Sequence, residues 1–197
     1  MLYFPMTELD ETRMWQAAAV HYGDHRRAYH TMDGHLRGMY RWWERFGWDY
    51  CPKLDAGVLA HDVILDGQGR HEERSAMWYS AVSGDAMDTD VPQMILSTAS
   101  HVPQGGWGVG DPRLIVLDLA DFLDEATTRA NSDRIVKEAQ RFDITRSERD
   151  ILQTSTAYLR GLATRLEAGV PAAPSMPIGP IQDGVIATIY RLENGII

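Results

Sequence analysis

Apolar residues recur at helical spacing in successive segments of this chain, and glycine or proline separates most of these segments. The clearest segment covers residues 145–166 and opens with Thr145-Arg146-Ser147-Glu148, which has the form of a helix capping box. An apolar stripe follows, formed by Ile151, Leu152, Tyr158, Leu159, Leu162 and Leu166. Gly169 and Pro171 then end the segment. This pattern predicts an all-α fold.

The same spacing predicts earlier helices over residues 8–22, 31–46, 52–62, 72–83, 90–101, 111–123 and 128–140. Residues 170–184 are rich in proline and glycine and are typical of a linker. Of all the segments, only residues 185–192 have strand character. We therefore expect one helical domain over residues 1–169 and a C-terminal extension over residues 170–197. The extension is expected to be a β-strand or hairpin, an oligomer contact or a mobile tail.

Composition limits the partners that this chain can have. Its 197 residues, 44% of them hydrophobic, suffice for one domain with a buried core. A net charge of -9 disfavours an extended nucleic-acid partner and favours a small anionic ligand. Cys51 has no second cysteine to pair with, which favours a reducing compartment. The acidic opening is unlike a signal peptide and no apolar run reaches membrane-spanning length, so we expect a cytoplasmic protein without a membrane partner. Homo-oligomer formation stays open.

Histidines and carboxylates gather around the pair His61-Asp62, which ends a predicted buried helix. The rest of the set is His30, His35, His101, Asp118 and Asp121. The last two lie three apart on a predicted helix, so both carboxylates can face the same way. Imidazole nitrogens and carboxylate oxygens suit a divalent transition metal, and such a metal can polarise a phosphoryl oxygen and ionise a water. Seven histidines can also cluster by chance, but the pattern favours metal-dependent phosphate chemistry.

The order of these motifs resembles the HD-domain metal-dependent phosphohydrolases, and is most similar to small predicted HD hydrolases. The resemblance covers residues 22–166. It rests on Arg27-Ala28-Tyr29-His30, His35, His61-Asp62, His71-Glu72-Glu73-Arg74-Ser75-Ala76 and Thr98-Ala99-Ser100-His101. In that family an all-helical fold gathers a histidine, an HD pair and a later aspartate around one or two metals. The resemblance therefore implies an HD-domain helical bundle that binds Mn, Fe, Co, Ni or Zn, with one ion or two.

Carried over residue by residue, the resemblance implies four metal ligands and one general acid. The ligands are His35, His61, Asp62 and Asp121, and the acid is His30. Asp121 stands in the Ala-Asp-hydrophobic context of the family, which Asp118 matches less well; Asp118 is then a ligand or an acceptor that orients a histidine.

The interval between His30 and His35 departs from the family pattern, because four residues separate the histidines instead of three. An i,i+5 pair does not share a helix face, so His30 must precede the regular helix or a bulge must realign the pair. The roles of general acid and metal ligand can therefore be exchanged between His30 and His35.

Five further residues are candidates for roles around this centre. Glu72 or Glu73 can position the attacking water or bind a second metal, although acidic residues in a first turn also suit the helix dipole. His101 can serve a second metal or be a surface residue. Arg27 lies beside His30 and has a guanidinium that matches phosphate oxygens. Trp107 lies in the glycine-rich loop 105–110, a candidate substrate lid.

The sequence therefore predicts a hydrolase that attacks a small phosphate ester or anhydride with water activated at a metal. The favoured substrate is a nucleotide, whether a nucleoside mono- or triphosphate or a cyclic or signalling nucleotide. Two alternatives stay open. One is a nucleotide- or metal-binding sensor with a catalytically weak site; the other is a structural or oligomerisation role, which the apolar segment 185–197 supports.

Overall fold

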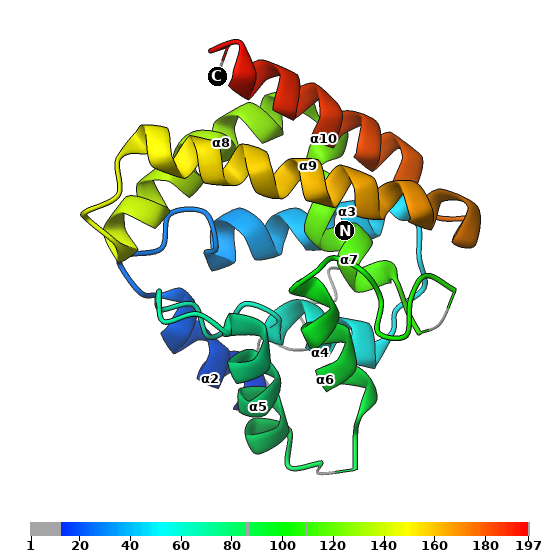
Figure 1. Cartoon of the computed structure of the whole chain (residues 1–197). Coiled ribbons are helices and arrows are strands. Elements are labelled where there is room, and N and C mark those ends of the chain that lie inside the picture. The colour runs from blue at the N-terminus through cyan, green and yellow to red at the C-terminus, as the bar shows by residue number, and fades with distance from the viewer. Residues whose placement is uncertain (1–12, 86, 109, 197) are drawn as a thin grey trace.

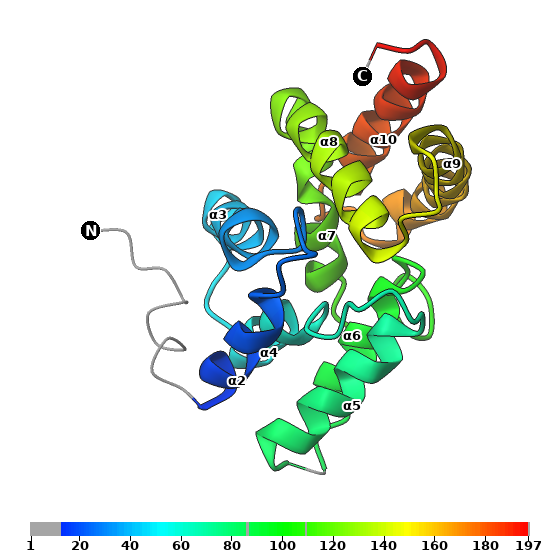
Figure 2. The same ribbon diagram turned by 90° about the vertical axis from the view of Figure 1, so that its left-hand side faces the viewer.

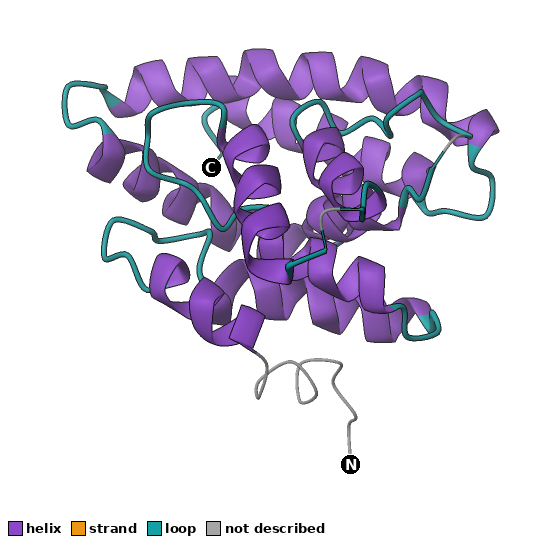
Figure 3. Cartoon of the chain, turned by 90° about the horizontal axis from the view of Figure 1, so that it is seen from below, coloured by secondary structure: helices purple, strands orange, loops and turns teal. Residues whose placement is uncertain are grey.

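The computed structural model describes residues 13–85, 87–108 and 110–196, and every regular element in these ranges is a helix (Figures 1 and 3). The elements are α2 (Arg13–Tyr22), the π-helix η1 (Met32–Leu36), α3 (Arg37–Phe46), α4 (Pro52–Ala60), α5 (His71–Ser83), α6 (Asp90–Thr98), α7 (Arg113–Leu119), the 3₁₀-helix η2 (Ala120–Leu123), α8 (Glu125–Phe142), α9 (Glu148–Ala172) and α10 (Ile178–Glu193). The predicted all-α fold is confirmed for this part of the chain. Residues 8–12 of the first expected helix lie outside the described residues.

The helix α7 lies at the centre of the fold because apolar side chains on both of its faces are buried. Leu114 and Leu117 face a first hydrophobic core among α2 to α6. Ile115 and Leu119 face a second core, formed with α9 and α10. A helix that is apolar all round must be covered all round, and Figure 2 shows α7 between the group α2, α4, α5 and α6 and the group α8, α9 and α10. The carboxylate of Asp118 on this helix is therefore held between the two cores.

The helix α4 positions the His61-Asp62 pair. Pro52 begins this helix, where a missing N–H costs nothing, and Leu54 and Val58 are fully buried in the first core. His61 is the C-terminal cap residue. The pair therefore lies where the sequence predicted it, at the C-terminal end of a buried helix.

The expected C-terminal strand is wrong, because residues 178–193 form the helix α10. Ile178, Ile181 and Val185 recur at helical spacing and are buried against α9 in the second core. Pro180 stands in the first turn of this helix, where the backbone N–H groups have no helical partner. Packing of this apolar stripe outweighs the strand preference of its β-branched residues. The segment joins the core of the helical domain, and only residues 173–177 separate α9 from α10.

Among the described residues, none of the helices combines the length and the apolar character needed to cross a membrane.

Candidate metal centre

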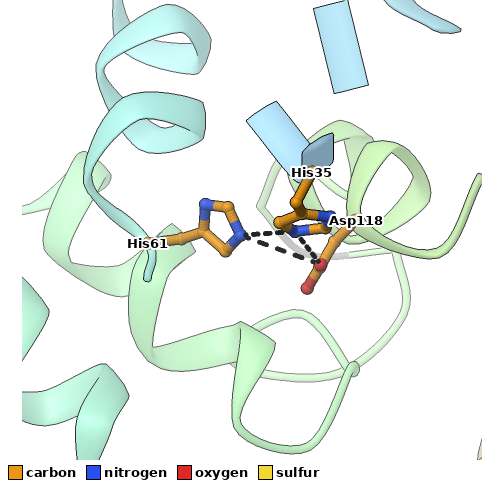
Figure 4. Close-up of side chains that lie close together, drawn as sticks. All are labelled: His35, His61 and Asp118. Atoms are coloured by element: carbon orange, nitrogen blue, oxygen red, sulfur yellow. Dashed lines mark hydrogen bonds and ion pairs between the residues drawn. The ribbon is translucent and has the colours of Figure 1, made fainter. Parts of the chain in front are cut away.

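Two histidines and one aspartate from three separate elements converge on one point (Figure 4). His35 Nε2 in η1 lies 3.1 Å from His61 Nε2 and 3.1 Å from Asp118 Oδ1 in α7. His61 Nε2 lies 3.7 Å from the same carboxylate oxygen. The three ligand atoms lie within 4.8 Å of one another, so the group can hold a metal ion. We call His35, His61 and Asp118 the metal group.

The backbone fixes the tautomer of His61. Its Nδ1 lies 2.8 Å from the carbonyl oxygen of Val58, one turn earlier in α4. Because a carbonyl only accepts, this contact keeps a proton on Nδ1 and leaves Nε2 as the ring nitrogen that faces the metal group. The ring is almost completely buried. His61 is therefore held as a ligand is usually held.

The π-helix η1 accommodates the irregular four-residue interval between His30 and His35. The hydroxyl of Thr31 caps this helix by accepting from the N–H of Gly34 at 3.0 Å. A side chain at Gly34 would meet Thr31 Oγ1 at 2.8 Å and Tyr29 O at 3.0 Å, so the tight turn needs glycine. His35 lies inside the π-helix and is buried, whereas His30 precedes it. Both structural solutions expected from the spacing are present together.

Asp62 lies at the edge of the metal group. Its Oδ2 is 3.1 Å from His61 Nε2, 3.6 Å from His30 Nε2 and 3.8 Å from His35 Nε2. Burial alone would lower the pKa of His61, but the carboxylates of Asp62 and Asp118 outweigh it and raise that pKa to about 9. Burial opposes ionisation of Asp62, yet the charges of His61 and His30 hold its pKa below the usual range. The two carboxylates, whose side chains are 15% and 13% exposed, favour a positive charge between them, which a divalent ion can supply.

The aspartate in the metal group is Asp118. This corrects the expectation that Asp121 is the metal ligand of the two aspartates. Asp121 Oδ2 accepts from Asn131 at 2.7 Å, and its Oδ1 accepts from the indole N–H of Trp42 at 3.2 Å. Asp121 stands in η2, where the contacts with Asn131 of α8 and Trp42 of α3 hold its carboxylate outside the metal group.

His101 holds the second oxygen of Asp118. Its Nε2 donates to Asp118 Oδ2 at 3.1 Å, and its Nδ1 accepts from the hydroxyl of Tyr158 at 2.5 Å. The residue has a left-handed backbone, with φ of 52°. This geometry fits a histidine that orients the carboxylate of the metal group.

Glu138 is a residue of this site that the sequence reasoning missed. One of its carboxylate oxygens accepts from the backbone N–H groups of Ala28, Tyr29 and His30 at 2.8, 2.9 and 3.0 Å. The other contacts His30 Nδ1. Burial alone would raise the pKa of Glu138, but these contacts, with His30 first among them, lower it to about 2. Burial would lower the pKa of His30, and the charges of Asp62 and Glu138 reverse that effect and raise it.

Arg27 does not offer its guanidinium to a substrate, which corrects the expectation of a phosphate-binding role. It is 5% exposed and donates to the carbonyl oxygens of His30, Asp62 and Val63 at 3.1, 2.9 and 2.8 Å. Arg27 therefore ties the backbone ahead of η1 to the chain that follows α4. Its role is to hold the two histidine segments together.

The remaining predicted residues lie outside the metal group. Glu73 is exposed and pairs with Arg70. Glu72 is half-buried; burial and the charge of Asp118 raise the pKa of Tyr158 to about 12, and the charge of Glu72 acts in the same direction. Trp107 packs on Gly169 of α9 and donates to the carbonyl oxygen of Arg165 at 3.3 Å. Its indole is partly buried and packs against the second core, and the expectation that it binds substrate as part of a lid stays a prediction.

A cavity of about 440 Å³ lies between α8 and α9 and reaches the metal group through Asp118. His30 and His101 also line it, so the acid candidate and the orienting histidine both face the same space. The fold and the site together define an all-α protein with a buried His-His-Asp metal group at the wall of a cavity. Comparison with protein-family models, with curated proteins and with solved structures gives no significant match.

Proposed function

We propose that this protein is a metal-dependent phosphohydrolase that acts on a small phosphate ester or anhydride. The single observation that carries the proposal is the convergence of His35, His61 and Asp118 beside a cavity that His30 also lines. The order of the motifs, which resembles that of HD-domain phosphohydrolases, supports the same class of reaction. One cysteine in the chain agrees with action in the reducing cytoplasm.

The donor set fits a divalent transition metal. His35 and His61 offer two nitrogens, Asp118 offers an oxygen, and Asp62 lies close enough to supply another. Mn, Fe, Co, Ni and Zn all accept such a set, and two histidines with one carboxylate suit Fe(II) in particular. When bound there, such an ion supplies Lewis-acid polarisation of a phosphoryl oxygen and lowers the pKa of a water.

The residues around the metal group have the parts for proton transfer. Glu138 fixes Nδ1 of His30, which leaves Nε2 to hold a proton 3.6 Å from Asp62 Oδ2. From this atom His30 can donate the proton to the leaving oxygen of a substrate in the cavity. His101 donates to Oδ2 of Asp118 and so keeps Oδ1 of that carboxylate facing His35 and His61.

The experiment is phosphate release from a panel of phosphomonoesters, cyclic nucleotides and nucleoside triphosphates, assayed with protein loaded with each metal in turn. The test variant is His61→Ala with Asp62→Ala. The matched control is His25→Ala, since the His25 side chain is 94% exposed. We expect release by the parent and the control, and loss of release in the double variant. Equal release by all three proteins would exclude the metal-hydrolase proposal, and tight nucleotide binding without turnover would favour the sensor.

A further inference from the structure

The surface that lines the cavity is mainly apolar, although the lining also includes polar side chains, namely Thr128, Asn131, Ser132, Thr154, Ser155 and Thr188. Ile135, Val136 and Ala139 line it from α8, and Leu152, Leu159 and Leu162 line it from α9. A volume of about 440 Å³ lies within the range of pockets that enclose a small organic ligand. An apolar wall of this kind favours an apolar occupant because it removes hydrocarbon surface from water.

The charges at the cavity do not suit a polyphosphate. Among the described residues that line it, Arg146 is the single lysine or arginine, and Asp118 and Asp121 are acidic. Arg146 also donates to the hydroxyl of Thr154 at 3.0 Å. A nucleoside triphosphate would bring several negative charges to a space that offers a single arginine, and no lysine, besides a bound metal and the histidines. The negative charge of one phosphate group is what Arg146 and a metal bound at the metal group can balance.

From this arrangement we infer that the cavity selects phosphate monoesters whose organic group is an apolar hydrocarbon chain, with the phosphate at the metal group and the chain between α8 and α9. The inference rests on the proposed function, because it takes the metal group as the seat of the phosphate. It narrows the substrate class away from nucleotides, whose bases and riboses would present polar edges to the mainly apolar walls.

The test is binding of ethyl-, butyl-, hexyl- and octylphosphonate, which cannot be hydrolysed, to manganese-loaded protein by titration calorimetry. We expect affinity to rise by up to about fourfold for each added methylene until the cavity is full. AMP and ATP serve as comparators and should bind more weakly than octylphosphonate. Affinity that is independent of chain length, or ATP as the tightest ligand, would overturn the inference.

A matched pair of variants tests whether the hydrocarbon chain of the ligand lies in the cavity. Ile135→Asn changes a wall residue that is 38% exposed, so the fold should tolerate it. Ile144→Asn changes an isoleucine that is 88% exposed and lies outside the cavity lining. The first variant should weaken octylphosphonate binding by about tenfold while keeping its metal, and the second should bind like the parent. Equal binding by both variants would place the chain elsewhere and overturn the inference.

Hydrolysis assays separate this inference from the proposed function. Phosphate release that is faster from octyl phosphate than from ethyl phosphate and AMP supports both. Release from all three at similar rates keeps the hydrolase and overturns the substrate class. Chain-dependent phosphonate binding with no release from any ester keeps the cavity assignment and contradicts the hydrolase.

Discussion

The carboxylate of Glu138 in α8 contacts the imidazole of His30, which lies 108 positions earlier in the chain. The same carboxylate accepts three backbone N–H groups from residues 28–30, so it fixes both the ring and the backbone that carries it. A charged acceptor for several donors makes strong hydrogen bonds. Glu138 therefore links α8 to the segment that presents His30.

The first prediction concerns the stability of this link against pH. Glu138→Gln keeps the size of the side chain and removes its charge, and we expect it to lower the free energy of unfolding at pH 7 by about 2 kcal/mol. The pKa of Glu138 is lowered from 4.5 to about 2 in the folded protein. Its contribution to stability is therefore complete above pH 4.5 and is lost as the pH falls toward 2. Urea denaturation at pH 7, 4 and 3 should show the difference between parent and variant shrinking with acidity. A constant difference would contradict this account.

The second prediction separates the two histidines of the irregular interval. His35→Ala should lose bound metal, because it removes a nitrogen from the metal group. His30→Ala should keep the metal and lose catalytic rate by about 100-fold or more, as expected when a general acid is removed. Elemental analysis and steady-state kinetics measure the two effects, with His25→Ala as the control. Metal loss in His30→Ala with retention in His35→Ala would reverse the assignment.

The third prediction distinguishes the two aspartates. Asp118→Asn should lower metal affinity by more than the roughly 10- to 100-fold that the loss of an orienting neighbour usually costs. Asp121→Asn should keep the metal, because Asp121 bonds to Asn131 and Trp42 and lies outside the metal group. Competition with a chromogenic chelator gives both affinities. Equal loss in the two variants would show that Asp121 also reaches the ion.

The sequence predicted the parts of this site that depend on local pattern. Apolar spacing was sufficient to predict the helices as far as α9, and the order of the motifs brought His35, His61 and Asp62 into consideration together. The choice between Asp118 and Asp121 depended on the contacts that Asp121 makes with Asn131 and Trp42, which the residues next to it in the sequence do not determine. Glu138 carried no local signal, because its partners lie more than a hundred positions away.

The C-terminal helix shows the same limit. Residues 185–192 contain enough β-branched and aromatic residues to suggest a strand, and the proline and glycine residues before them suggest a linker. The helix forms because Ile178, Ile181 and Val185 meet the second core along one face. Burial of that face against α9 determines that the segment is helical, and local propensity alone does not predict this.

The last prediction tests whether α10 is part of the folded domain, using two glycines in neighbouring helices. A Cβ at Gly184 in α10 would lie 1.9 Å from the carbonyl oxygen of Phe122, which is backbone and cannot turn aside. Gly184→Ala should therefore destabilise the protein by about 1–3 kcal/mol despite the better helix propensity of alanine. At Gly161 in α9 the nearest atom is the flexible end of Arg165 at 3.1 Å, so Gly161→Ala should be neutral or stabilise by up to about 1 kcal/mol. Thermal and urea unfolding of both variants measure the contrast. Gly184→Ala with unchanged stability would mean that α10 does not pack against η2 in solution.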